Sequence, residues 1–242
     1  MISEKLGALV NCIFKISIKP NYRLCCKMSS SVHNISNEGI VQPDNETWIF
    51  GYGSLVWKAD FPYEEKRTGY IKGYIRRFFQ NSIDHRGTHE NPGRVVTLIH
   101  SENPDAKVWG MGYKIAESNK TDVLNHLDHR EKNGYERHKV VFYPYPVSET
   151  QSNEPKSILL YLATKENPSF AGENDSLEKI ANQILGAAGE SGRNVEYVFK
   201  LADAMRQLYP GEDDDHLFEL ERILKTHDPN ACDSRPQLMK EG

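Results

Sequence analysis

The sequence predicts an α+β fold, in which a curved and largely antiparallel sheet, or a small mixed β-barrel, is flanked by helices. The first observation is the order along the chain. Segments with strand character are concentrated before residue 164, and most helical periodicity follows residue 174. Such segregation is typical of α+β proteins, whereas strands and helices alternate in a doubly wound α/β sheet. The second observation is the regular alternation over 108–115, which indicates a strand with one buried face.

The predicted strands share a high content of β-branched and aromatic residues. The first, residues 48–52, is a short apolar run that reaches a glycine-rich turn. The remaining segments of this kind are residues 68–79, 94–100, 108–115, 137–143 and 157–163. We expect these segments to build the sheet.

Apolar residues at helical spacing predict helices over 118–130, 177–188, 195–205 and 217–224. The second of these helices has strong end signals, because Asp175 is followed by Glu178 three residues later and Gly189 comes at the far end. The acidic run 213–215 lies where the last helix begins, a position that favours negative charge.

The composition excludes two broad classes of protein. The 242 residues carry a net charge of −4, so the basic excess of a nucleic-acid-binding protein is absent. No apolar run reaches the roughly 20 residues that a membrane helix needs. We therefore expect no nucleic-acid partner and no membrane insertion. A monomer or weak dimer is our expectation for the assembly, and the composition does not decide it.

The four cysteines, Cys12, Cys25, Cys26 and Cys232, all lie near the ends of the chain. A disulfide framework would cross-link the central body, and zinc sites commonly use closely spaced cysteine pairs. Neither pattern is present. This usage fits a reducing compartment and predicts a cytoplasmic protein without a metal site.

Three regions are predicted along the chain. Residues 1–46 form an extension expected to be disordered, residues 47–226 form the folded domain, and residues 227–242 form a C-terminal tail. The start of the extension is basic, with Lys5 and Lys15 among its cations and Glu4 as an acid. Mitochondrial targeting is the alternative interpretation of this extension.

The run Gly51-Tyr52-Gly53-Ser54-Leu55 directly follows a predicted buried strand. Glycines allow a tight turn and close approach of a ligand, so backbone N–H groups here are suited to a carboxylate or an oxyanion. A tight turn between strands is the alternative. The run lacks the third glycine of a dinucleotide fingerprint, and Leu55 and Val56 after Ser54 do not fit a nucleophile elbow.

Glu131 is a candidate acid or base. It lies four residues after Leu127 and seven after Leu124, so a helix continued to this point places its carboxylate on the apolar face. Burying a charge is costly unless it is paired or neutralised. The alternative is that Glu131 pairs with an arginine or faces solvent.

Other polar groups suggest weaker hypotheses. His126, Asp128 and His129 invite a metal site, but no HExxH motif is present. A triad of Ser54 with His129 and Asp128 is disfavoured because adjacent residues of a helix point apart. The polar stretch 81–94 predicts either a lid, an anion-binding loop or a solvated connection.

These motifs together resemble the ChaC family of glutathione-specific γ-glutamylcyclotransferases. The resemblance covers about three quarters of the chain, from Trp48 to Lys225. It rests on residues 48–57 (WIFGYGSLVW), 61–63 (FPY), 84–87 (DHRG), 92–98 (PGRVVTL), 130–135 (REKNGY), 191–194 (SGRN) and 216–218 (HLF). The form of the 130–135 motif is similar to that of the constitutive branch rather than the stress-induced one.

The resemblance implies a small β-barrel with surrounding helices, and cleavage of glutathione in the cytosol to 5-oxoproline and cysteinylglycine without a metal or organic cofactor. It implies that Glu131 is the catalytic acid/base. It implies that the γ-glutamyl group is bound by Phe50, Gly51, Tyr52, Gly53, Ser54 and Leu55. Tyr143, and Tyr113 on a neighbouring strand, are further candidates for hydrogen bonding to substrate, with a structural role as the alternative.

Two functional alternatives remain open at this point. One is a cyclotransferase that accepts other γ-glutamyl peptides or amines, since no residue shows whether the site reads cysteinylglycine. The other is a binding module that keeps the fold without catalysis, against which the presence of both Glu131 and the glycine run argues. A regulator of an ion transporter would need an apolar or amphipathic docking segment, and the sequence contains none.

Overall fold

The computed structural model describes residues 46–130, 135–146, 149–150 and 152–228. The predicted extension 1–46 lies outside this part except for its last residue, and so does nearly all of the predicted tail 227–242. Glu131 also lies outside the described residues.

A closed barrel forms the centre of the described fold. Its strands are β1 (Thr47–Gly51), β5 (Lys107–Ile115), β2 (Glu65–Lys72), β6 (Tyr135–Pro144) and β7 (Lys156–Ala163), in that order around the barrel. Neighbouring strands are antiparallel except where β7 closes on β1, with Ile49 opposite Leu159 in a parallel pair. Every residue of β1 is buried, because Trp48 and Phe50 pack into one apolar cluster and Ile49 packs into another, which explains the continuous apolar run.

A separate antiparallel hairpin consists of β3 (Tyr74–Ser82) and β4 (Gly93–His100). The prediction of one strand over 68–79 is therefore wrong. The chain leaves the barrel at the end of β2 and turns at Gly73, whose φ of +79° lies in the region that favours glycine. The turn residue was hidden in an otherwise continuous stretch of strand formers.

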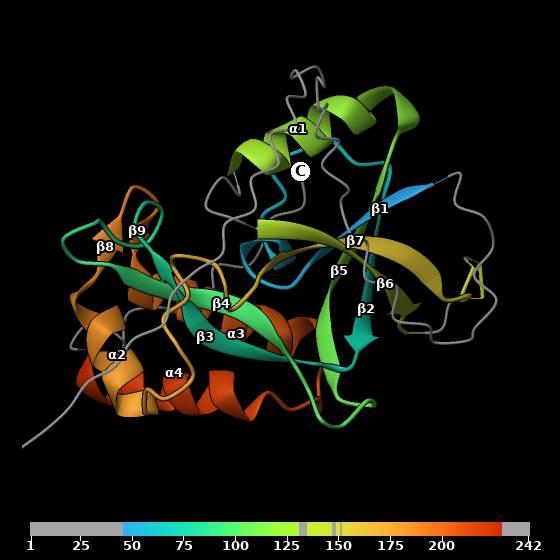
Figure 1. Cartoon of the computed structure of the whole chain (residues 1–242). Coiled ribbons are helices and arrows are strands. Elements are labelled where there is room, and N and C mark those ends of the chain that lie inside the picture. The colour runs from blue at the N-terminus through green and yellow to red at the C-terminus, as the bar shows by residue number, and fades with distance from the viewer. Residues whose placement is uncertain (1–45, 131–134, 147–148, 151, 229–242) are drawn as a thin grey trace, which may run out of the picture. The chain divides into compact units, whose positions relative to one another are not determined.

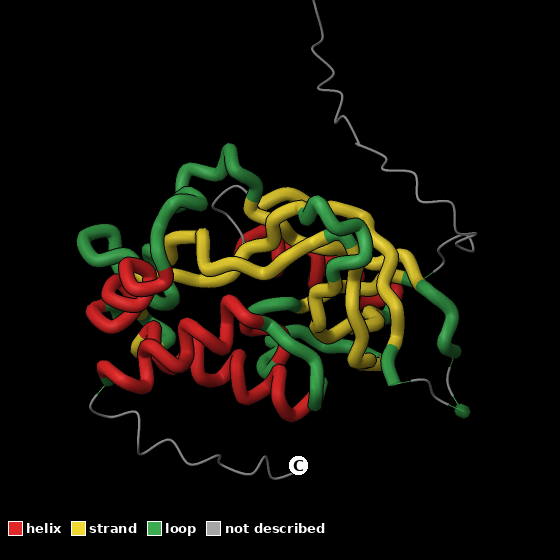
Figure 2. Tube along the Cα trace, turned by 90° about the horizontal axis from the view of Figure 1, so that it is seen from below, coloured by secondary structure: helices red, strands yellow, loops and turns green. Residues whose placement is uncertain are grey.

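Three helices cover the β3–β4 hairpin: α2 (Leu177–Gly186), α3 (Asn194–Leu208) and α4 (Asp215–His227). Helices α2 and α3 contact β4, and α4 contacts β3. Figure 1 shows these helices gathered on the side of the fold that carries the hairpin, and Figure 2 shows them running along one side of the strands. The larger hydrophobic core lies between them and the sheet.

Helix α1 (Lys120–Arg130) follows a 3₁₀ turn, Glu117–Asn119, and lies on the other side of the barrel (Figure 1). Val123 and Leu127 pack against Ile49 and Met111 in a second apolar cluster. Val123 and Leu127, with Leu124 packed beside them, form the apolar face that their helical spacing predicts.

Side chains cap the N-terminal ends of α4 and α2. Asp214 caps α4 and accepts a hydrogen bond from the Leu217 N–H, as the acidic run predicts. The signal at Asp175 was misassigned, because Ser176 is the cap of α2 and accepts from the Lys179 N–H at 3.3 Å. The carboxylate of Asp175 instead pairs with Arg94 and Lys179. The α+β fold class with a small barrel and flanking helices is confirmed.

No helix in the described ranges is both long and apolar enough to cross a membrane.

Candidate active site

A cavity of about 490 Å³ opens at the end of β1. Its walls come from the end of β1 and the turn after it, from β3 and β4, from α3, and from the ends of α1 and β6. The lining residues are Phe50, Gly51, Tyr52, Gly53, Ser54, Leu55, Trp57, Lys58, Asp60, Gln80, Asn81, Ser82, Asp84, His85, Arg86, Val95, Val96, Leu127, Tyr135, Tyr161, Glu190, Ser191, Tyr197 and Lys200.

The turn of residues 51–55, called here the glycine loop, needs its two glycines because of close packing. A Cβ added at Gly51 would lie 2.5 Å from the Leu55 Cβ. A Cβ added at Gly53 would lie 2.8 Å from the Tyr197 Oη and 3.2 Å from a Val96 methyl group. The loop therefore approaches both its own return segment and the opposite wall of the cavity too closely for a larger residue.

Hydrogen bonds hold the glycine loop in this shape. The Val56 N–H donates to the Gly53 carbonyl at 3.0 Å, which begins the 3₁₀ turn Ser54–Val56. Tyr113 Oη donates to the Leu55 carbonyl at 2.6 Å. Within the part of the chain that the structure describes, no residue accepts a hydrogen bond from the N–H of Gly53 or Leu55. A rigid loop with free N–H groups in a cavity is suited to bind an oxyanion.

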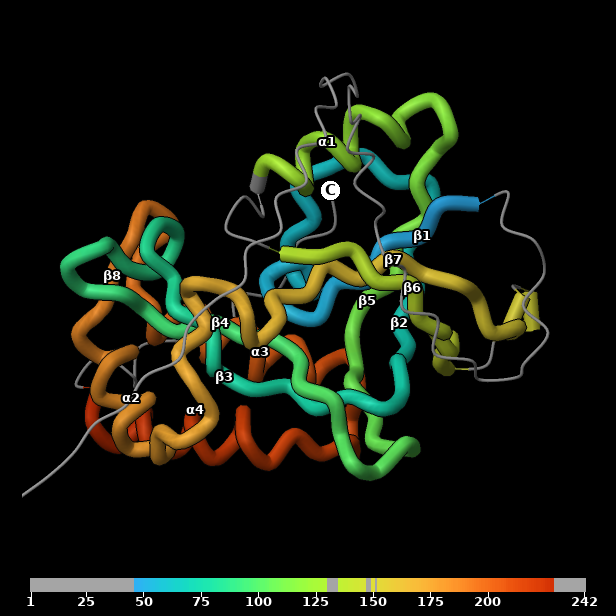
Figure 3. The backbone as a smooth tube through the Cα atoms, viewed as in Figure 1, coloured from blue at the N-terminus to red at the C-terminus, as the bar shows by residue number. Residues whose placement is uncertain are grey.

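The edge of the cavity that faces the glycine loop, called here the rim, joins two segments that are distant in sequence. The β3–β4 connection (residues 83–92) runs beside a small hairpin, β8 (Ala188–Gly189) and β9 (Gly192–Arg193), as Figure 3 shows. Backbone N–H groups of Glu190 and Ser191 donate to the carbonyls of Asp84 and His85 at 3.1 and 2.9 Å. This rim brings carboxylates, an imidazole and a guanidinium to the mouth of the cavity.

Arg86 is the buried cation of this rim. Its Nη1 donates to the Arg193 carbonyl at 3.0 Å and lies 3.7 Å from a Glu196 carboxylate oxygen. The guanidinium also lies over the Tyr197 ring at 5.9 Å. Burial lowers the pKa of Arg86, and the negative charge of Glu196 opposes that shift. An arginine with these partners remains charged at neutral pH.

Tyrosines close the cavity on the barrel side. Tyr161 Oη donates to Asp128 Oδ1 at 3.0 Å, and Tyr52 Oη donates to the Tyr161 carbonyl at 3.0 Å. Burial, followed by the bond to Asp128, raises the pKa of Tyr161 above its ordinary value. Tyr161 therefore keeps its proton at neutral pH and can donate, but it does not serve as a base.

The comparisons with known proteins agree on one family. A family model described as ChaC-like protein matches residues 47–227. The chain belongs to the ChaC-like family. The match spans the described barrel, hairpin and helices almost from end to end.

Two relatives and one solved structure illustrate the likeness of this ChaC-like protein. A Danio rerio protein named glutathione-specific gamma-glutamylcyclotransferase 1 is 44% identical over 189 residues, which are 77% of this chain and 93% of that protein. A Schizosaccharomyces pombe protein named glutathione-specific gamma-glutamylcyclotransferase is 40% identical over 196 residues, 76% and 95% of the two chains. A crystal structure of a yeast γ-glutamyl cyclotransferase specific to glutathione superposes with a TM-score of 0.70 at 28% identity, covering 77% and 99%. These names do not separate the two branches of the family, so the constitutive assignment stays a prediction.

The structure brings together most of the residues predicted for the site of this ChaC-like protein. Phe50 and all five residues of the glycine loop line one cavity. Leu127, four residues before Glu131, and Tyr135, four residues after it, line the same cavity. Tyr113 is not a lining residue and instead supports the loop from behind through Leu55.

Tyr143 lies away from the cavity. It is eight residues from Tyr135 along β6, which corresponds to roughly 26 Å of extended strand. Its ring stacks on Tyr70 with centroids 5.2 Å apart, and Lys72 Nζ lies 5.5 Å from the ring. This position gives no support to the prediction that Tyr143 contacts the substrate.

The alternative hypotheses find no support either. Among the described residues, no group of three His, Cys, Asp or Glu side chains could hold a metal ion. Asp128, the proposed third member of a triad, binds Arg137 and Tyr161 instead. His126 lies 3.4 Å from Asp60, so it belongs to a surface contact.

Sequence reasoning missed several cavity residues, among them Gln80, Tyr135, Tyr161 and Tyr197. The tyrosines read as ordinary strand and core residues, because aromatic residues are common in both. Gln80 carried only a weak signal, since it is a polar side chain that directly follows Phe78 and Phe79 in a strand of mixed composition.

Proposed function

We propose that this ChaC-like protein cleaves glutathione by an internal cyclisation. The α-amino nitrogen of the γ-glutamyl residue attacks its own γ-carbonyl carbon, a five-membered ring closes, and the amide bond to cysteine breaks. The products are 5-oxoproline and cysteinylglycine, and no water is consumed. Support comes from relatives at 40–44% identity that are named glutathione-specific gamma-glutamylcyclotransferases.

The observation that carries the proposal is the glycine loop at the cavity wall. Attack on the γ-carbonyl places negative charge on its oxygen, and that charge needs preorganised donors. The N–H groups of Gly53 and Leu55 have no acceptor within the described chain. Loss of one such donor typically lowers turnover by about 100- to 1,000-fold in other enzymes.

The cavity also suits the folding of the substrate. A volume of about 490 Å³ lies within the range of small-ligand sites. Holding the glutamyl chain bent, so that amine and carbonyl meet, can supply up to about 7–11 kcal/mol of the barrier in the best intramolecular cases. No nucleophilic side chain is required, because the substrate supplies its own nucleophile.

We assign the proton transfers to Glu131. The attacking amine is an ammonium near neutral pH and must lose a proton, and the departing amide nitrogen must gain one. One carboxylate can perform both transfers in turn. An ordinary glutamate pKa of about 4.3 makes a weak base, so partial burial that raises it towards roughly 6–7 would serve the reaction. Leu127 and Tyr135, which bracket Glu131 in sequence, both line the cavity.

We infer that glutathione is the only ligand this mechanism needs, since each step uses groups of the protein and the substrate alone. The net charge of −4 supports the absence of a nucleic-acid partner. The distribution of cysteines supports a cytosolic location, with mitochondrial targeting by the extension as the alternative. A monomer or weak dimer stays our expectation for the assembly.

The test compares the parent protein with Glu131→Gln, which keeps the shape of the side chain but cannot take a proton. Each protein is given glutathione, and 5-oxoproline and cysteinylglycine are measured together. Glu136→Gln is the matched control, because Glu136 is an exposed glutamate near the start of β6, five residues after Glu131. We expect equal amounts of both products from the parent and the control, and almost none from Glu131→Gln.

Two results would contradict the proposal. Full activity of a folded Glu131→Gln would remove this residue from the mechanism. Absence of product from the parent would remove glutathione cleavage itself. A third arm with γ-glutamyl-alanine decides specificity, because turnover comparable to that of glutathione would favour the broader cyclotransferase.

A further inference from the structure

Gln80 carries a buried carbonyl oxygen to which no residue in the described part of the chain donates a hydrogen bond. The residue lies near the end of β3, is 1% exposed and lines the cavity. Its Nε2 donates to Asn167 Oδ1 at 3.0 Å. Its Oε1 is buried and has no hydrogen-bond partner among the described residues.

The orientation of this carboxamide follows from its neighbours. The backbone N–H of Ser169 donates to Asn167 Oδ1 at 2.8 Å, and a backbone N–H can only donate. The atom of Asn167 that faces Gln80 is therefore an oxygen, so Gln80 must turn its nitrogen towards it. Asn167 is buried and is not among the lining residues of the cavity. The oxygen of Gln80 consequently points away from Asn167.

Gln80 and the glycine loop line the same cavity. Gln80 is paired with Val95 across the β3–β4 hairpin. The next residue, Val96, is the one whose methyl group would meet a Cβ on Gly53 at 3.2 Å. An acceptor on β3 and backbone donors of the loop thus belong to residues that line one cavity.

We propose that Gln80 Oε1 accepts a hydrogen bond from an N–H group of the bound γ-glutamyl substrate. Two N–H donors flank the reacting carbonyl: the α-amino group and the scissile amide. In the folded protein the Gln80 oxygen loses its hydrogen bonds to water and gains none from the described residues. A donor on the substrate would supply a hydrogen bond in their place. Gln80 is neutral and transfers no proton, so its contribution is to bind and orient the nitrogen. This inference rests on the proposed function.

Gln80→Met tests the proposal because methionine has a similar length and no acceptor. We expect kcat/KM for glutathione to fall by roughly 10- to 100-fold, the range for loss of one buried hydrogen bond to substrate. Thr97→Val is the control, since Thr97 is fully buried in β4, donates to the Ala163 carbonyl at 2.9 Å and is not a lining residue. The control should lower the melting temperature and leave kcat/KM unchanged.

A depsipeptide analogue of glutathione, with an ester oxygen in place of the scissile N–H, identifies the donor. If Gln80 binds the scissile amide, the deficit of Gln80→Met disappears with the ester. If it binds the α-amino group, the deficit is the same for both substrates. Either result supports the hydrogen bond, and background cyclisation of the ester is subtracted.

Gln80→Glu gives a second reading that does not depend on the methionine variant being stable. A protonated glutamate can donate to Asn167 and still present a carbonyl, whereas an ionised one repels the Asn167 oxygen. Its activity relative to the parent should therefore rise from about pH 8 to about pH 5, and the ratio for Gln80→Met should stay flat.

The proposal is overturned if Gln80→Met is folded and has the kcat/KM of the parent, or if its deficit matches that of Thr97→Val. Failure of the proposed function has a different signature, namely a parent that forms no 5-oxoproline. In that case calorimetric binding of glutathione decides the question. Binding weakened by Gln80→Met supports the hydrogen bond, and equal binding refutes it.

Discussion

Asp128 and Arg137 form a two-point ion pair that joins the end of α1 to the start of β6. Arg137 Nε donates to Asp128 Oδ1 at 2.9 Å, and its Nη2 binds the second carboxylate oxygen. Tyr161 contributes a further bond to Asp128 and lies beneath the guanidinium, 5.8 Å from it. The pair spans Glu131 in sequence, so it ties down the chain on both sides of the proposed catalytic residue.

We expect Arg137→Met to lower kcat by roughly 3- to 10-fold, because misplacement of a catalytic group is costly. Unfolding free energy should change by less than about 1 kcal/mol, since exposed ion pairs contribute little. Arg222→Met is the matched control, because Arg222 makes a similar two-point pair with Glu219 on α4. Steady-state kinetics and urea unfolding test this, and an unchanged kcat in both variants would contradict the positioning role.

Gly51→Ala and Gly53→Ala should each reduce kcat/KM by more than about tenfold, because a Cβ forces the donors of the loop out of place. The new atom at position 51 meets Leu55, and the new atom at position 53 meets the Tyr197 hydroxyl. Gly186→Ala is the control, since no atom lies within 4 Å of a Cβ at the end of α2. There we expect normal activity and a small gain in stability, up to about 1 kcal/mol. Normal activity in the two loop variants would show that the glycines serve packing only.

The sequence was sufficient to predict the local parts of this fold and site. The glycine loop is recognisable because a buried strand, glycines and a turn follow one another within a few residues. The α4 cap and the apolar faces of the helices are local patterns of the same kind. Glu131 became a candidate through its spacing from Leu124 and Leu127.

The remaining parts depend on contacts between distant segments. The rim of the cavity forms when the β3–β4 connection meets β8 and β9, about 100 positions further along, and strands of two residues have no periodicity to detect. Asp175 was misread as a helix signal because its partner Arg94 lies in β4, about 80 positions earlier in the chain. The role of Gln80 appears only once Asn167 and Ser169 are beside it.

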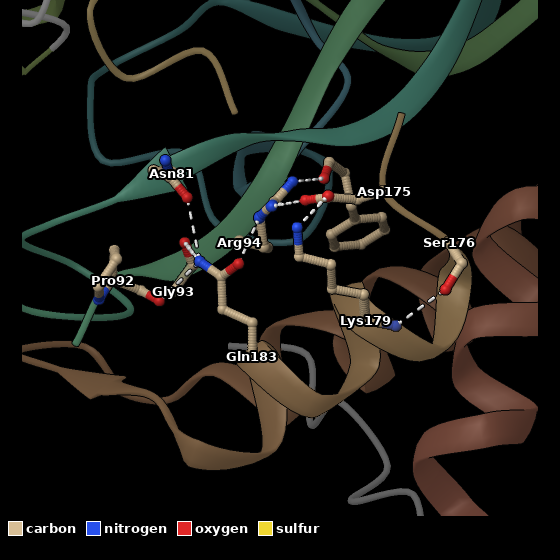
Figure 4. A network of polar contacts seen from close by, with 9 residues as sticks. Asn81, Pro92, Gly93, Arg94, Asp175, Ser176, Lys179 and Gln183 are labelled. Carbon is tan, nitrogen blue, oxygen red and sulfur yellow. Dashed lines mark hydrogen bonds and ion pairs between the residues drawn. The ribbon is translucent and has the colours of Figure 1, made fainter. Parts of the chain in front are cut away.

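Arg94 holds the β3–β4 hairpin against α2, as Figure 4 shows. Its side chain is 4% exposed, pairs with Asp175, and donates through Nε to Gln183 Oε1 at 2.8 Å. We expect Arg94→Met to cost about 3 kcal/mol of unfolding free energy, because the largely buried groups of Asp175 and Gln183 both lose the guanidinium that binds them. Lys179→Met is the control, since this lysine also binds Asp175 but is 70% exposed, and it should cost less than about 1 kcal/mol. Equal midpoints of urea unfolding for the two variants would refute this ranking.

His216 makes the stability of the fold depend on pH in a defined window. Burial, followed by the nearby charge of Arg77, lowers the pKa of His216 from 6.5 to about 4. The neutral ring accepts a hydrogen bond at Nε2 from the Phe78 N–H at 3.1 Å, which a protonated ring could not do. Between about pH 6.5 and pH 4 the unfolded chain therefore binds a proton that the folded chain does not, so the contribution of His216 to the free energy of unfolding falls as the pH falls.

His216→Gln keeps an acceptor without titrating, and its stability should decline less over this window in urea unfolding measured at several pH values. His126→Gln, at a half-exposed site on α1, should follow the parent. Parallel curves for all three proteins would mean that His216 binds its proton equally in the folded and unfolded states.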